Sequence, residues 1–265
     1  MIQVKSSIQK YQVFGVLKFI GVVGVFVWYV ARGTEKMGYN WQWYRVPRYL
    51  FTIRDGQFIT GPLLEGLGLT FKIAGVSLLL ALVFGLITAL FRLSHSFTAR
   101  ALARCYLELI RNTPLLIQLF FIYFVLAPLV DMDAFTSAVL ALSLFEGAYA
   151  SEILRAGIVS IHKGQWEAAY SLGISTYHSY RDVILPQAIR SILPPLTSQG
   201  ISLIKDSALV STIAIYDLTM QGQAIVAETF LTFEIWFTVA AIYLVVTLSL
   251  SLLVQVIETK MSHYM

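Results

Sequence analysis

Long apolar stretches alternate with short polar segments along most of the chain. Each stretch is long enough for an α-helix to cross the hydrocarbon layer of a bilayer, which takes roughly 20 residues. The stretches lie at residues 14–31, 63–91, 101–126, 135–154, 183–204 and 233–257. The pattern predicts an all-α integral membrane protein with about six transmembrane helices. An even number of crossings places both termini on the same side, and the distribution of lysine and arginine favours the cytoplasmic side.

The first apolar stretch, at 14–31, is compatible with a retained helix or with a cleavable signal peptide. The sequence VARG that follows is a poor match to a small-x-small cleavage site, and Trp28 and Tyr29 resemble the aromatic belt of a membrane helix. Residues 33–60 then combine aromatic rings with arginines, which suits the headgroup region at the outer face of the membrane. We therefore expect an N-terminal unit at 1–60, with a retained helix, and a core at 61–265.

The segment from Gly164 to Pro186 lies between apolar stretches but is too polar to cross a membrane. Glycine inside a helix costs about 1 kcal/mol relative to alanine. We therefore expect Gly173 to end one helix, with Ser175 or Thr176 capping the next. The predicted local structure is a helix, a glycine turn and a second helix.

Helical periodicity divides this segment into two faces. One stripe contains Trp166, Ala169, Tyr170, Gly173 and Tyr177, and the opposite side contains Glu167, Ser171, Ser175 and His178. Small residues at Ala168, Ala169 and Gly173 would let the backbone of another protein approach closely. The segment is therefore predicted to dock on a partner.

Composition limits the chemistry that this chain can carry. Hydrophobic residues make up 57% of its 265 residues and charged residues 13%, whereas a soluble domain has about 25% charged residues. The net charge of +4 is small and is not clustered, so no nucleic-acid partner is expected. The sequence lacks a GxxxxGK[S/T] motif, an HExxH motif and a Cys, His and Asp cluster with metal spacing. We expect no catalytic or metal site, and any nucleotide chemistry must reside on a partner.

Four motifs occur in a fixed order. Glu167-Ala168-Ala169, followed by Gly173 and by Ile184-Leu185-Pro186, resembles the EAA signature of the membrane permease subunits of bacterial ABC importers. Three more resemble the branch of that family that takes up polar amino acids: RNTPLLIQLFFIYF at 111–124, GAYASEILRAGI at 147–158 and ISLIKDSALVSTIAIYDLT at 201–219. The likeness covers about residues 61–261.

The resemblance implies a five-helix type I permease core, preceded here by one extra helix, in the bacterial inner membrane. It also implies that the polar segment is a cytoplasmic coupling helix that docks on an ATPase. The residues implied in this docking are Glu167, Ala168, Ala169, Tyr170, Ser171 and Gly173. The implied partners are two ATPase subunits that carry ATP and magnesium, a second permease subunit of the same or a similar chain, and an extracytoplasmic amino-acid-binding protein. No cofactor is implied in this chain, and the identity of the amino acid stays open.

Ionisable groups inside spans are costly, so each is a candidate for the transport step. Glu108 with Arg111, and Glu152 with Arg155, have i,i+3 spacing. We expect each pair to form an ion pair on one helix face, with direct ligand contact as the alternative. Glu146 has no charged neighbour within a helical turn. Its carboxylate is expected either to receive an amino-acid ammonium group or to make a structural hydrogen bond.

Pro114 interrupts the stretch at 101–126 and removes a helical hydrogen bond, so a kink is expected there. Asn112, Thr113 and Gln118 beside it supply amide and hydroxyl groups. These groups are interpreted either as the lining of a polar path or as packing contacts.

Lys205 and Asp206 lie at the outer end of the fifth apolar stretch. The resemblance implies an outer gate in this region, and a solvated pair at the interface is the alternative. Two other classes of protein also stay open. Intramembrane carboxylates and a broken helix suit a proton-coupled secondary transporter as well. A membrane enzyme is a third class, although the sequence offers no nucleophile and base pair or metal set.

Overall fold

The computed structural model describes residues 15, 18–25, 28–33, 35–54 and 56–262, and the chain divides into two compact units, 1–43 and 44–265. In the first unit, residues 18–25 and 28–33 are helical, as the first apolar stretch predicts. The remaining residues of that stretch lie outside the described residues. The division falls before residue 60 because the short helix at residues 47–50 packs against the long helix that begins at Pro62.

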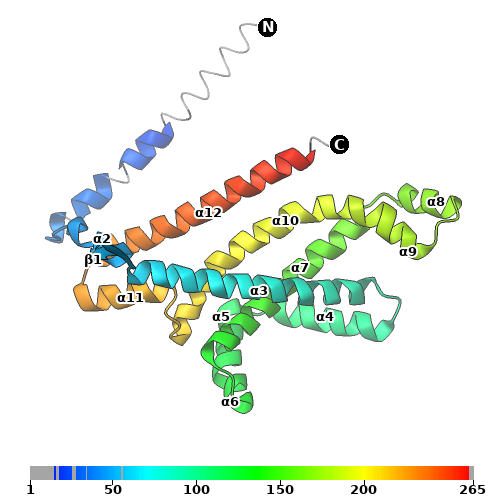
Figure 1. The fold of residues 1–265 in the computed structure, drawn as a ribbon, viewed down its shortest axis with the longest axis horizontal. Coiled ribbons are helices and arrows are strands. Elements are labelled where there is room, and N and C mark those ends of the chain that lie inside the picture. Colours follow the sequence, from blue (N-terminus) through cyan, green and yellow to red (C-terminus); the bar gives the residue numbers. More distant parts are fainter. Residues whose placement is uncertain (1–14, 16–17, 26–27, 34, 55, 263–265) are drawn as a thin grey trace, which may run out of the picture. The chain divides into compact units, whose positions relative to one another are not determined.

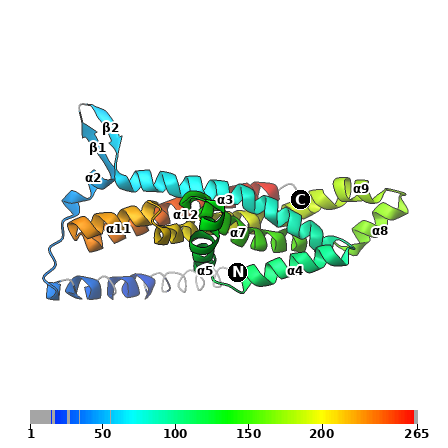
Figure 2. The same cartoon turned by 90° about the horizontal axis from the view of Figure 1, so that it is seen from below.

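The second unit begins with short elements that the hydrophobic pattern does not predict. They are η1 (Trp43–Arg45), α2 (Pro47–Leu50), β1 (Phe51–Arg54) and β2 (Gln57–Thr60). The two strands form an antiparallel hairpin in which Arg54 lies opposite Gln57. The hairpin projects from the start of the next helix (Figure 2). Gly56 has a φ of 75°, which favours glycine in a tight turn. The dipeptide Asp55-Gly56 is a strong hairpin signal in the sequence.

Helices account for almost all of the remaining chain. They are α3 (Pro62–Leu93), α4 (Phe97–Arg111), α5 (Leu115–Phe120), η2 (Phe121–Leu126), α6 (Ala127–Val130), α7 (Ala134–Val159), α8 (Lys163–Ser171), α9 (Thr176–His178), η3 (Ser179–Ile184), α10 (Leu185–Asp206), η4 (Ser207–Ile213), α11 (Leu218–Thr229) and α12 (Thr232–Ser262). Within the described residues, α3, α7 and α12 are long and apolar enough to cross a membrane. A fourth span is added if α4 and the bent segment that follows it, Leu115–Val130, cross the membrane as one unit. The all-α membrane architecture is confirmed, but the expected number of six spans is not.

The central contact of the second unit is between α3 and α7, which lie side by side (Figures 1 and 2). Small residues allow the two helices to approach closely. A Cβ atom added to Gly85 on α3 would lie 2.8 Å from the Cβ of Ala150 and 3.2 Å from the carbonyl oxygen of Gly147, both on α7. Helix association in membranes depends on such close packing. Gly85 therefore sets the distance between the two helices.

The chain breaks sharply at Pro114, where α4 and the helical segment from Leu115 meet at 104°. Figure 1 shows α5 and α6 leaving the direction of α3 and α4. Proline has no N–H, so the carbonyl of Ile110 loses its helical partner. The Nε2 of Gln118 donates to that carbonyl at 2.7 Å and to the carbonyl of Thr113 at 2.9 Å. The expected kink is confirmed. The two helical segments meet at nearly a right angle, a sharper break than a kink within one continuous helix.

The two ends of the second unit are formed by different elements (Figure 1). One end carries the turn between α3 and α4 together with α8 and α9. The other end carries α2, the hairpin, α11 and the start of α12. A buried apolar cluster joins α3 to α11 and α12 at this second end, through residues such as Leu63, Leu218 and Ile235. The polar segment at 164–186 therefore lies at the end of the bundle opposite the hairpin.

Candidate functional site: the coupling loop and the buried polar groups

The polar segment forms the helix, glycine turn and helix that its sequence predicts. Gly173 follows the end of α8 with a φ of 72°, the left-handed conformation in which helices commonly end. The N–H of Ile174 donates to the carbonyl of Ala169 at 3.1 Å and satisfies a carbonyl at the helix end. Ser175 caps α9, accepting from the N–H of His178 at 3.5 Å. We name residues 163–178 the coupling loop, after the docking role that the sequence resemblance implies and that stays a prediction.

Apolar side chains surround the glycine turn and are left uncovered by the rest of the described chain. Leu172 is 79% exposed, Tyr177 68% and Tyr170 48%. Ala168 is exposed, and a Cβ added to Gly173 would meet no atom within 4 Å. Large exposed apolar side chains at the tip of a loop, next to small residues, are typical of a protein contact surface.

Ala169 does not lie on this exposed surface, so the expected small-residue surface of Ala168, Ala169 and Gly173 is wrong at this position, and a role of Ala169 in ATPase docking stays a prediction. Ala169 is 3% exposed. It shares its helix face with Trp166, whose side chain faces η3. The ring of Trp166 packs edge-on against the ring of Tyr180 in η3, with 4.8 Å between the two ring centres. Ala169 therefore holds α8 against its own protein, while the neighbouring Ala168 stays accessible.

Glu167 and Ser171 occupy the polar side of α8, as helical periodicity predicts. The Glu167 carboxylate pairs with Lys163 at 3.1 Å, and both side chains are well exposed. The hydroxyl of Ser171 donates to the carbonyl of Glu167 at 2.8 Å. Such solvent-exposed pairs contribute little to stability, so both residues are free to change partners.

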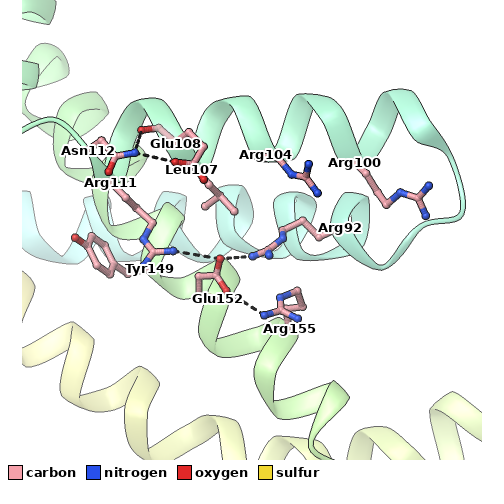
Figure 3. Close-up of a pocket in the computed structure, with 10 residues that line it drawn as sticks. All are labelled: Arg92, Arg100, Arg104, Leu107, Glu108, Arg111, Asn112, Tyr149, Glu152 and Arg155. Atoms are coloured by element: carbon pink, nitrogen blue, oxygen red, sulfur yellow. Dashed lines mark hydrogen bonds and ion pairs between the residues drawn. The ribbon is translucent and has the colours of Figure 1, made fainter.

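Glu152 is the centre of a charged cluster that joins three helices (Figure 3). Its carboxylate pairs with Arg92 of α3, with Arg111 of α4 at 3.3 Å and with Arg155 of α7 at 3.4 Å. The expected pair of Glu152 with Arg155 is confirmed. The role of Arg92 is missed by the sequence pattern, because its only signal is a basic residue in the last turn of a helix.

Glu108 and Arg111 do not form the expected ion pair. The carboxylate of Glu108 instead accepts from the Nδ2 of Asn112 at 2.8 Å. Arg111 reaches across to α7, where its guanidinium also lies 5.7 Å from the ring centre of Tyr149. Spacing within one helix predicts the pair, but the neighbouring helix supplies a better placed carboxylate on Glu152.

The polar residues beside Pro114 lie at the broken end of α4. Asn112 Nδ2 also donates to the carbonyl of Glu108 at 2.8 Å, and the hydroxyl of Thr113 donates to the carbonyl of Leu109 at 2.8 Å. The carbonyl of Glu108 also keeps its backbone bond from the N–H of Asn112. The Thr113 hydroxyl and the Gln118 amide therefore bond the carbonyls of Leu109 and Ile110, which the break leaves without a helical partner. This arrangement favours the packing interpretation, and a role of these residues in a polar path stays a prediction.

Glu146 is buried in the middle of α7, with 2% of its surface exposed. Its Oε2 accepts from the Nε2 of Gln199 on α10 at 2.6 Å, which confirms a structural hydrogen bond. Its Oε1 makes no hydrogen bond within the described part of the protein. The carboxyl group of Asp206 lies close enough to interact with it. Two carboxyl groups and one amide therefore meet between α7 and α10, where Glu146 is buried and Gln199 and Asp206 are half-buried.

Lys205 and Asp206 are the last two residues of α10. Lys205 is exposed, and Asp206 turns toward Glu146. In the described residues the two form no ion pair, so a solvated ion pair is not observed. Their role in an outer gate stays a prediction.

The chain matches the family described as binding-protein-dependent transport system inner membrane component over residues 81–263. It is 42% identical over 202 residues to the glutamine transport system permease protein GlnP of Escherichia coli strain K12, covering 75% of this chain and 92% of that protein. It is also 42% identical over 206 residues to the L-cystine transport system permease protein TcyB of Bacillus subtilis, covering 77% of this chain and 88% of that protein.

Solved structures agree with the sequence comparisons. A chain of an amino acid ABC transporter crystallised with histidines matches with a TM-score of 0.71 and 40% identity, covering 75% of this chain and 94% of that chain. A chain of the inward-facing MetNI methionine ABC transporter shares the fold, with a TM-score of 0.65 at 18% identity. These likenesses support the importer reading and not a proton-coupled carrier. The chain therefore belongs to the family of binding-protein-dependent transport system inner membrane components and is a permease subunit of an ABC importer.

Proposed function

We propose that this permease carries a polar amino acid across the bacterial inner membrane, in complex with two ATPase subunits and a second permease of the same or a similar chain. An extracytoplasmic binding protein delivers the amino acid, and ATP with magnesium binds only on the ATPase subunits. The coupling loop carries this proposal. Its exposed Leu172, Tyr170 and Tyr177 surround a glycine turn at one end of the bundle.

The physical basis of coupling is a rigid-body motion. Closure of the two ATPase subunits on ATP would draw the two coupling loops together. Because α8 is held to η3 by Trp166 and Tyr180, and η3 leads directly into α10, movement of the loop passes to the membrane helices. ATP thereby shifts the population from inward-open to outward-open states.

The docking step is tested by replacing Gly173 with tryptophan. The added ring enters open space at the glycine turn, so it should obstruct the ATPase and not the permease interior. We expect an ATPase to copurify with the tagged wild-type chain in mild detergent and to be lost from Gly173→Trp. Gly173→Asn is the matched control, because asparagine tolerates the left-handed conformation and is much smaller.

A second variant separates docking from backbone strain. Leu172 is 79% exposed, so Leu172→Glu should leave the thermal unfolding temperature unchanged and still reduce recovery of the ATPase. Full recovery of the ATPase with both Gly173→Trp and Leu172→Glu would contradict the proposed docking role.

Glu146 is the strongest candidate in this chain for recognition of the transported amino acid. Its unpaired Oε1 and the nearby carboxyl group of Asp206 offer acceptor oxygens to an ammonium group, and the charge of that group would favour the ionised carboxylate. We expect Glu146→Gln to abolish most uptake of labelled amino acid while the ATPase still copurifies, because the amide keeps the bond to Gln199 but cannot ionise to pair with an ammonium group. Wild-type uptake by this variant would remove Glu146 from the transport path.

A further inference from the structure

An open cavity of about 460 Å³ lies between α3, α4 and α7, beside the charged cluster centred on Glu152 (Figure 3). Its lining contains five arginines and two glutamates: Arg92, Arg100, Arg104, Arg111, Arg155, Glu108 and Glu152. The lining therefore carries three more positive than negative charges. We name this cavity the arginine pocket.

Neither carboxylate of the arginine pocket neutralises Arg100 or Arg104. Glu152 is shared by the three other arginines, and Glu108 is bonded to Asn112. In the described part of the chain Arg100 and Arg104 form no ion pair. They are four residues apart on α4, which places them on one helix face. Figure 3 shows both side chains extending from α4 toward the side on which Arg92 lies.

The chemistry of the arginine pocket suits a phosphate group. Guanidinium groups present a fork of N–H donors that matches phosphate oxygens, and they keep their charge at all physiological pH values. Two arginines without carboxylate partners can neutralise a group with one or two negative charges. Segregation of basic residues to the cytoplasmic side accounts for their presence at this end of the bundle, but not for their convergence on a cavity.

A second cavity, of about 590 Å³, adjoins the first along α4. It shares Arg100, Arg104 and Glu108 with the arginine pocket and adds Phe97, Ala101 and Cys105. A charged cavity thus borders a more apolar one at the end of the bundle that carries the turn between α3 and α4. This combination fits a ligand with a phosphate head and an apolar body.

We propose that the arginine pocket binds a phosphate group through Arg100 and Arg104. The phosphate belongs either to the headgroup of an anionic phospholipid or to a free phosphate ion. In both cases the ligand lies between α3, α4 and α7, so it stabilises the packing of these helices. The proposal is independent of the amino acid that is transported.

The test uses the purified full-length chain in mild detergent. Phosphatidylglycerol and phosphatidylcholine with the same acyl chains are added separately, and inorganic phosphate is compared with chloride at equal ionic strength. Thermal unfolding temperature and the mass of retained lipid are measured. The variant is Arg100→Gln with Arg104→Gln. The control is Arg181→Gln with Arg190→Gln, which removes the same charge from exposed arginines outside the pocket.

For a lipid ligand, we expect phosphatidylglycerol to stabilise the wild type and the control more than phosphatidylcholine does. Binding by the pocket variant should weaken by about fivefold for each arginine removed. If inorganic phosphate stabilises the wild type and the pocket variant loses this effect, the ligand is free phosphate. Equal effects of the two lipids together with equal effects of phosphate and chloride would overturn the proposal. Unchanged binding by the pocket variant would also overturn it.

Discussion

Replacing Glu152 with glutamine is expected to lower the free energy of unfolding by about 2–3 kcal/mol. The change removes the one carboxylate that Arg92, Arg111 and Arg155 share, and it leaves three guanidinium groups close together. Removing one partner of a fully buried ion pair costs roughly 3–5 kcal/mol. The expected loss is smaller here because 26% of the Glu152 side chain is exposed to solvent.

Thermal unfolding of the purified chain in detergent measures this effect. Glu108→Gln is the matched control, because Glu108 lines the same cavity but is exposed and bonded only locally to Asn112. It should change stability by less than about 1 kcal/mol. Added salt should recover part of the loss in Glu152→Gln, since salt screens the repulsion among the arginines. Equal stability of the two variants would contradict the central role of Glu152.

Alanine substitutions at two glycines of α3 are expected to differ in their effect on stability. Gly85→Ala should destabilise the protein by about 1–3 kcal/mol, because the new methyl group overpacks the contact between α3 and α7. Two of the three nearest atoms, in Gly147 and Ser151, belong to the α7 backbone and cannot move alone. At Gly75 a Cβ would meet nothing within 4 Å. Gly75→Ala should therefore be neutral or stabilise the helix by up to about 1 kcal/mol.

The measurement is again the unfolding temperature in detergent, together with the yield of folded protein from the membrane. Gly85→Val extends the series, because valine adds two more methyl groups at a site that is already too tight for the methyl group of alanine. Its yield should be the lowest of the three variants. If Gly85→Ala were as stable as Gly75→Ala, α3 and α7 would lie further apart than the structure places them.

Local features follow well from the sequence. Gly173 ends α8 and Ser175 caps α9 because a positive φ and a side-chain acceptor are properties of single residues. The break at Pro114 follows from the missing N–H of proline. The hairpin at 51–60 carries a recognisable Asp55-Gly56 signal, but the aromatic residues around it also suit a membrane interface, and the hydrophobic pattern does not distinguish the two.

Contacts between helices do not follow from spacing along one helix. Periodicity pairs Glu108 with Arg111, yet Arg111 binds Glu152 because α7 packs beside α4. Periodicity also groups Ala169 with the exposed residues of the coupling loop, yet Ala169 is buried on the side where Trp166 meets Tyr180.

The sequence by itself determined the membrane class of this protein, the glycine turn at Gly173, the break at Pro114 and, through its ordered motifs, its family. Those properties rest on apolar length and on the backbone preferences of individual residues. Only the tertiary structure decided which arginines surround Glu152, how closely α3 approaches α7, and which residues of the coupling loop stay exposed. These depend on distances between side chains far apart in the chain, and such distances are set by the packing of whole helices.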